Sequence, residues 1–156
     1  MALLGRQQAD LYAAETEALE GLGLAWRRLP AAQAYLDALI GSAWFFDHWP
    51  TLVRVTIERR GRGSVWSTCQ HLDAHGPHNR ATEGVILVAE GSLTQAVVLH
   101  ELAHLLLPAG AGHGPAFART MLRLVRHEMG FFAFSALHEA LRHTESFRAV
   151  DFADVG

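Results

Sequence analysis

The chain has 156 residues, half of them hydrophobic and 19% charged. This length fits one domain with its own buried core, so we expect a single domain over residues 1–156. The formal net charge is −3 and every Lys/Arg position is an arginine. Because this composition gives no broad basic surface, nucleic acid is not an expected partner. The single cysteine, Cys69, excludes an intramolecular disulfide and a cysteine-rich zinc ribbon.

The N-terminal stretch MALLGRQQADLYAAETEALE has a short apolar start and then turns acidic. It lacks the long apolar segment of a signal peptide. No run in the chain reaches the roughly 20 apolar residues that cross a bilayer. We therefore expect a cytoplasmic protein that does not associate with membranes. The sequence leaves the oligomeric state open.

Hydrophobic periodicity and turn residues predict helices on both sides of a central group of strands. The expected helices cover residues 6–20, 30–40, 93–107, 115–129 and 132–144. Ser92, with Gln95 three residues later, has the spacing of a capping box and predicts the start of the third helix. Gly130 is expected to end the fourth helix. Helices that flank a group of strands in this order predict an α+β domain with a short, twisted, three-stranded sheet.

Three strands are expected between the helices. The sequence TLVRVTIER, residues 51–59, alternates so that Val53, Val55 and Ile57 share one face. GRG is a plausible turn, so the following SVWSTC is expected to pair with the first strand as a hairpin. VILVAE is apolar on both faces and predicts a third strand. If its Ile86 and Val88 lie at the edge of the sheet, an extended peptide could pair with that strand.

A polar segment, residues 70–83, separates the second and third expected strands. It holds His71, His75 and His78. We expect a loop near the active-site cleft, long enough to act as a lid. A second metal site is the alternative interpretation of its three histidines.

The helix expected over residues 93–107 contains the sequence HELAH. His100 and His104 are four residues apart, so they project from one face, about 6 Å apart along the helix axis. Two imidazoles at this spacing can share one Zn²⁺. Glu101 is rotated by about 100° from His100. It can therefore face the fourth coordination position and act as a general base toward water there. The alternative is a core helix whose histidines and glutamate have no catalytic role.

A catalytic zinc ion commonly has a third protein ligand, and the residues leave two candidates for it. His113 follows Pro108 in a glycine-rich stretch where the backbone can reverse and return to the metal. Glu128 lies on the next expected helix, at a separation found in families that use a downstream helical glutamate.

The residues from VVLHELAH to GHGPAF, residues 97–117, resemble the SprT-like (Spartan-like) zinc metallopeptidases. In that family, GHGPxF follows HExxH and its histidine is the third zinc ligand. The resemblance therefore implies a zincin-like fold, with His100, His104 and His113 as ligands of one zinc ion and Glu101 as the catalytic acid/base. SprT-like proteins often carry a zinc ribbon or DNA-binding regions after the protease core. Since this chain has one cysteine and a mildly acidic tail, a DNA-linked role is not implied.

HELAHLL followed by GHGPAFAR also resembles a family of small proteins of high-GC Gram-positive bacteria that are described as metallohydrolases, with no assigned substrate. Together these features predict a zinc-dependent metallopeptidase with a peptide or protein substrate. One alternative is a zinc hydrolase of a non-peptide substrate. The other is a zinc-binding or regulatory module without catalysis.

Overall fold

The structure, a computed structural model, describes residues 2–73 and 81–155. The chain divides into two compact units, one formed by Leu24–Gly110 and the other by Met1–Gly23 together with Ala111–Gly156. The single domain expected over residues 1–156 stays a prediction. Among the described helices, none combines the length and the apolar character that a bilayer crossing requires.

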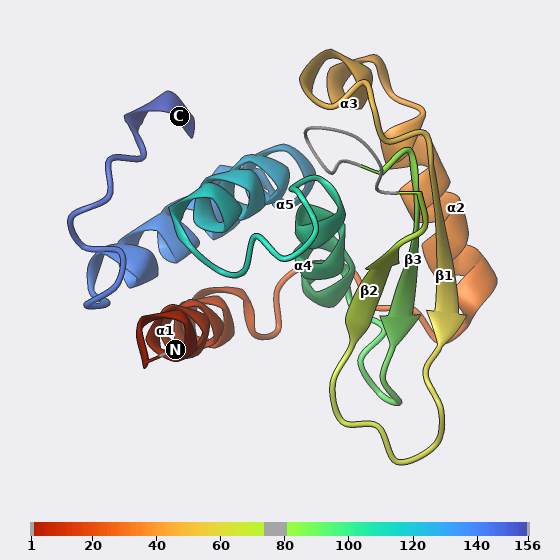
Figure 1. The fold of residues 1–156 in the computed structure, drawn as a ribbon, viewed down its shortest axis with the longest axis horizontal. Helices are drawn as coiled ribbons and strands as arrows, with labels where there is room; N and C mark the ends of the chain where they lie inside the picture. The colour runs from red at the N-terminus through yellow and green to blue at the C-terminus, as the bar shows by residue number, and fades with distance from the viewer. Residues whose placement is uncertain (1, 74–80, 156) are drawn as a thin grey trace. The chain divides into compact units, whose positions relative to one another are not determined.

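The unit Leu24–Gly110 contains the sheet. Its helices are α2 (Leu29–Ile40), α3 (Ala43–His48) and α4 (Gln95–Leu105), and its strands are β1 (Arg54–Arg59), β2 (Thr68–His71) and β3 (Glu83–Val88). The strand order is β1-β3-β2, with β3 parallel to β1 and antiparallel to β2 (Figure 1). The α+β class and the three-stranded sheet are therefore confirmed.

The hairpin expected between the first two strands is wrong, because β3 lies between β1 and β2. β3 is apolar on both faces, and a central strand also has both of its edges paired. Its Ile86 and Val88 are 0% and 1% exposed. The condition under which a peptide could pair with these residues at a sheet edge is therefore not met. The edges of the sheet are β1 and β2.

The outer edge of β1 is occupied by a side chain from α2, which runs beside this strand (Figure 1). Gln33 Nε2 donates to the carbonyl of Val55 at 2.8 Å, and its Oε1 accepts from the amide of Ile57 at 2.8 Å. Because these are the outward-facing backbone groups of β1, the Gln33 amide closes this edge to a further strand.

The sheet approaches α4 closely at a glycine, Gly84 of β3. Gly84 of β3 pairs with Val55 on one side and with His71 on the other. A Cβ at Gly84 would lie 2.7 Å from both methyl groups of Leu105 in α4. Leu105 is 2% exposed, so a shift of its side chain would disturb the packing of the surrounding core. The close approach of α4 to the sheet therefore requires glycine at this position.

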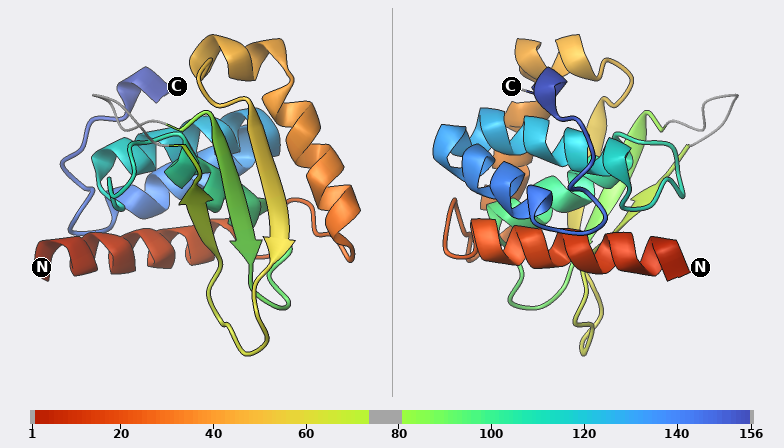
Figure 2. Two further views of the ribbon diagram at one scale, coloured as in Figure 1. Left: turned by 45° about the vertical axis from the view of Figure 1, so that its right-hand side comes forward. Right: turned by 90° about the vertical axis from the view of Figure 1, so that its left-hand side faces the viewer.

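The second unit is helical. It contains α1 (Ala2–Leu19), α5 (Pro115–Arg142) and the short helix η1 (Ala153–Val155). α1 and α5 pack side by side (Figure 2). Gly130 interrupts α5 with φ 89° and ψ 177°, a backbone conformation that glycine tolerates best. The predicted end of the fourth helix at Gly130, with a further helix after it, is confirmed.

Replacement of Gly84 by alanine tests the close approach of α4. The new methyl group would overlap Leu105, so we expect Gly84→Ala to lower the free energy of unfolding by about 1–3 kcal/mol. Urea denaturation measures this change. Gly61→Ala is the matched control, because a Cβ at Gly61 meets no atom within 4 Å. Equal stability of the two variants would show that the sheet and α4 are not in this contact.

Candidate metal centre

The helix that carries the HELAH residues begins at a different cap from the predicted one. The N-cap of α4 is Thr94, whose hydroxyl oxygen accepts a hydrogen bond from the amide of Val97 at 3.3 Å. The prediction of Ser92 as the cap, with Gln95 completing a capping box, is therefore wrong. Thr94 has the extended backbone conformation that a cap requires and a side-chain oxygen that satisfies one of the first free amides of the helix.

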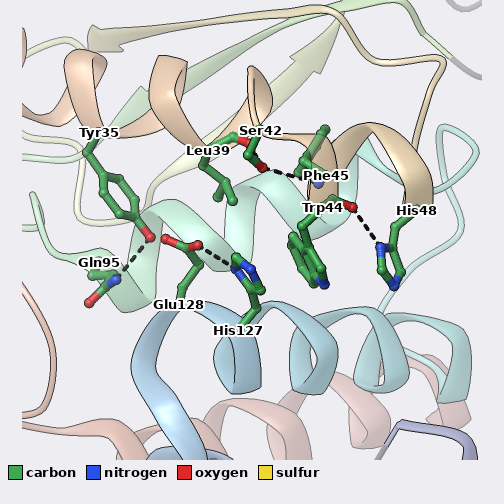
Figure 3. A network of polar contacts seen from close by, with 9 residues as sticks. All are labelled: Tyr35, Leu39, Ser42, Trp44, Phe45, His48, Gln95, His127 and Glu128. Atoms are coloured by element: carbon green, nitrogen blue, oxygen red, sulfur yellow. Dashed lines mark hydrogen bonds and ion pairs between the residues drawn. The ribbon is translucent and has the colours of Figure 1, made fainter.

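Gln95 has a different role, at the first residue of α4. Its Oε1 accepts from the amide of Leu24 at 3.0 Å. Its Nε2 donates to the hydroxyl of Tyr35 at 2.9 Å (Figure 3). Gln95 is 3% exposed. Because buried amides are stable only when they are hydrogen-bonded, this pair of contacts fixes the start of α4 against the segment that enters α2 and against α2 itself.

Polar and ionisable residues are concentrated in the buried part of α4. Among the residues that the structure describes, the buried polar or charged ones are Gln95, His100, Glu101 and Thr120. His100 and Glu101 are 5% and 6% exposed. Burying ionisable groups costs free energy, so a helix that only filled the core would carry apolar residues at these two positions. The burial favours a functional role over the core-helix alternative.

Three histidines lie close enough to bind a metal ion. The rings of His100 and His104 have centroids 5.1 Å apart and are inclined by 72°. With His113, their ligand atoms all lie within 4.8 Å of one another. A tetrahedral Zn²⁺ with bonds of about 2.0–2.1 Å separates two ligand nitrogens by about 3.3 Å, a separation that lies within this range. Three imidazoles also form a donor set that zinc favours.

The loop between α4 and His113 turns at glycines, as the sequence predicts. Gly110 and Gly112 have φ values of 80° and 71°, in the left-handed region that glycine enters at little cost. In the helical unit, the His113 ring lies 5.3 Å from the ring of Tyr12 in α1 and 5.0 Å from that of Phe117 in α5. Aromatic neighbours on two helices therefore orient this imidazole. Sequence reasoning missed Tyr12, because no local pattern relates residue 12 to residue 113.

Glu128, the rival third ligand, is not in this histidine group, which is the candidate metal-binding group found among the described residues. Its carboxylate lies 2.8 Å from Nδ1 of His127 (Figure 3). The side chain of Glu128 is 14% exposed, so it is not simply solvated at the end of a helix. The structure therefore favours His113 as the third candidate ligand.

The histidines of residues 70–83 do not all belong to a loop. His71 is the last residue of β2, and its Nε2 lies 3.1 Å from the carbonyl oxygens of both His104 and Leu107. His75 and His78 lie outside the described residues, as does half of the segment 70–83 that is expected to form a lid or a second metal site. The sequence did not predict this contact of His71 with the end of α4, although its two-residue spacing from Cys69 places both residues on one face of a strand.

Cys69 does not have the character of a nucleophile. Burial, together with a smaller effect of the negative charge of Glu101, raises the pKa of its thiol to about 12. The thiol is therefore protonated at neutral pH, whereas a nucleophilic cysteine needs a lowered pKa. Cys69 lies in β2, and its burial is intermediate.

Comparisons with protein-family models, with curated proteins and with solved structures find no match to this chain. The SprT-like resemblance therefore rests on the motif residues in the segment 97–117 and stays a prediction.

The raised pKa of Cys69 predicts slow alkylation. At pH 8, a thiol with a pKa of about 12 has roughly a thousandfold less thiolate than one with an ordinary pKa near 9. We expect iodoacetamide to modify the native, metal-free chain far more slowly than the urea-unfolded chain. Glu101→Gln should accelerate the native reaction because it removes a negative charge. Equal rates for the native and unfolded chains would contradict the raised pKa.

Proposed function

We propose that this chain is a zinc-dependent metallopeptidase in which His100, His104 and His113 hold one Zn²⁺ and Glu101 is the general base. The observation that carries the proposal is the placement of three imidazole ligand atoms within 4.8 Å of one another. The burial of Glu101, at 6% exposure, supports it further. So does the resemblance of HELAH and GHGPAF to the SprT-like metallopeptidases.

The residues divide the chemistry between them. A bound Zn²⁺ supplies a Lewis acid that polarises a carbonyl group and lowers the pKa of water to about 7. Three neutral imidazoles leave the positive charge of the ion undiminished, which maximises this effect. Glu101 takes the proton of the attacking water as its oxygen adds to the carbonyl carbon. Glu101 then gives the proton to the nitrogen of the leaving amine as the C–N bond breaks. The products are a carboxylic acid and an amine, and at neutral pH the acid proton passes to the amine, which leaves a carboxylate and an ammonium group.

The sheet supports a peptide as the substrate. β2 is an edge strand, and α4 packs against it and against β3. An extended peptide can add to the edge of a sheet through backbone hydrogen bonds. A peptide paired with β2 would thus bind to the same strand that contacts the HELAH helix. The zincin-like identity of the fold is part of this proposal.

Metal content tests the ligand set. We expect one zinc ion per native chain, measured by atomic emission after removal of excess metal. Removal of a residue that only hydrogen-bonds to a metal ligand weakens metal binding by up to about 100-fold. Because His113 is proposed to bind the zinc directly, His113→Ala should weaken zinc binding by more than this. Glu128→Ala is the matched control and should keep its zinc. The opposite result, in which Glu128→Ala loses its zinc and His113→Ala keeps it, would show that Glu128 and not His113 is the third ligand.

Activity tests the role of Glu101. The amide of Glu101→Gln has a similar size but cannot accept the proton, so this variant should keep its zinc. Its peptide hydrolysis should fall by about 100- to 10,000-fold. Mass spectrometry of a mixed peptide library incubated with the zinc-loaded protein measures cleavage. Undiminished cleavage by the variant would contradict this mechanism. A zinc-loaded native chain that cleaves no peptide would instead favour a non-peptide substrate or a module without catalysis.

A further inference from the structure

We infer that His71 is a positioning residue for the metal centre. Its imidazole holds the C-terminal turn of α4, from which His104 projects and from which the chain leaves toward His113. The inference rests on the proposed function, because it assigns His71 a role toward the zinc ligands. The contacts that support it all lie within the unit Leu24–Gly110.

The hydrogen bonds of His71 fix its tautomer and its role as a donor. Nε2 lies 3.1 Å from the carbonyl oxygen of His104 and 3.1 Å from that of Leu107. Carbonyl oxygens only accept hydrogen bonds, so Nε2 must carry the hydrogen. One N–H from the end of β2 is therefore shared between two carbonyls at the end of α4.

The end of α4 receives donors from the backbone and from outside the helix. The last carbonyls of any helix have no partner within the helix. Leu107 donates its amide to the carbonyl of His104 at 3.3 Å. The next residue, Pro108, has no amide hydrogen and cannot satisfy another carbonyl of this turn. His71 adds a side-chain donor from β2 at this point, beside the backbone amides of Leu106 and Leu107 that reach the carbonyl of His104.

A second contact at the same place makes this end of α4 rigid. Gly84 is the residue of β3 that pairs with His71. Leu105 of α4 packs so close to Gly84 that a Cβ atom there would overlap it. Two adjacent strands thus contact the same helical turn, one through a hydrogen bond and one through close packing. A ligand on that turn is held in position, because neither the height nor the rotation of the turn can change without loss of one contact.

Substitutions that separate hydrogen bonding from general stability test the inference. His71→Phe removes the donor and keeps a ring. His71→Gln can place an amide donor at about the reach of the imidazole Nε2, whereas the shorter side chain of His71→Asn cannot. Ile57→Val is the control, because it removes one methyl group from the core of the same unit and leaves the hydrogen bonds of His71 unchanged. Circular dichroism checks that each variant is folded.

The measurements are zinc affinity, by competition with a chromophoric chelator, and the visible spectrum of the Co²⁺-substituted protein. We expect His71→Phe and His71→Asn to bind zinc about 10-fold or more weakly and to change the Co²⁺ spectrum. His71→Gln should restore most of the affinity and the native spectrum, and Ile57→Val should keep both. If the phenylalanine variant does not fold, the comparison of glutamine with asparagine tests the donor alone.

Several results would overturn the inference. Native zinc affinity and spectrum in His71→Phe and His71→Asn would show that the turn is held without His71, while the metal site itself stands. Equal losses in His71→Gln and His71→Asn would exclude a role for the donor. A loss of zinc affinity in Ile57→Val as large as that in His71→Phe would show that His71 affects the metal centre only through the general stability of the unit. A native chain that binds no zinc would instead refute the proposed function, and the inference with it.

Discussion

The contact between the last turn of α4 and the strands β2 and β3 is the constraint on which the candidate site depends. Gly84 allows the helix to approach β3 until Leu105 occupies the space that a side chain would fill. The imidazole of His71 then reaches the carbonyls of His104 and Leu107 from β2. Close packing fixes the height of the helix end above the sheet, and a directional hydrogen bond fixes its rotation.

The opposite end of α4 is fixed by polar contacts of another kind. Thr94 caps the first turn, and the buried amide of Gln95 links the helix to Leu24 and Tyr35. Between these two ends the helix is surrounded by apolar contacts, with Leu99 and Leu102 fully buried. In such surroundings the effective dielectric is low, so charges on groups of α4 act strongly on one another and on any cation nearby. A helix held at both ends can keep ionisable groups in this environment without relaxing around them.

Local pattern predicted most of the elements and placed His100, Glu101 and His104 of the candidate site on one helix. The helices, the break at Gly130 and the alternation of Val55 and Ile57 follow from periodicity and from the conformational range of glycine, which act over a few residues. The sheet order and the N-cap were mispredicted for a common reason. The partner of a strand and the hydrogen bonds of Gln95 involve residues far away in the chain. Local periodicity in the sequence does not determine such contacts. The role of His71 was missed for the same reason.

By itself, the sequence determined the chemical identity and spacing of the candidate site. A spacing of four residues places His100 and His104 on one face of any α-helix, because the helix repeats every 3.6 residues, and Glu101 follows at a fixed rotation. The tertiary structure alone decided that His113 returns to these histidines while Glu128 does not. It also decided that β3 lies at the centre of the sheet and that His71 holds the end of α4. These features depend on loop conformation, strand register and close packing between distant residues, which the fold sets as a whole.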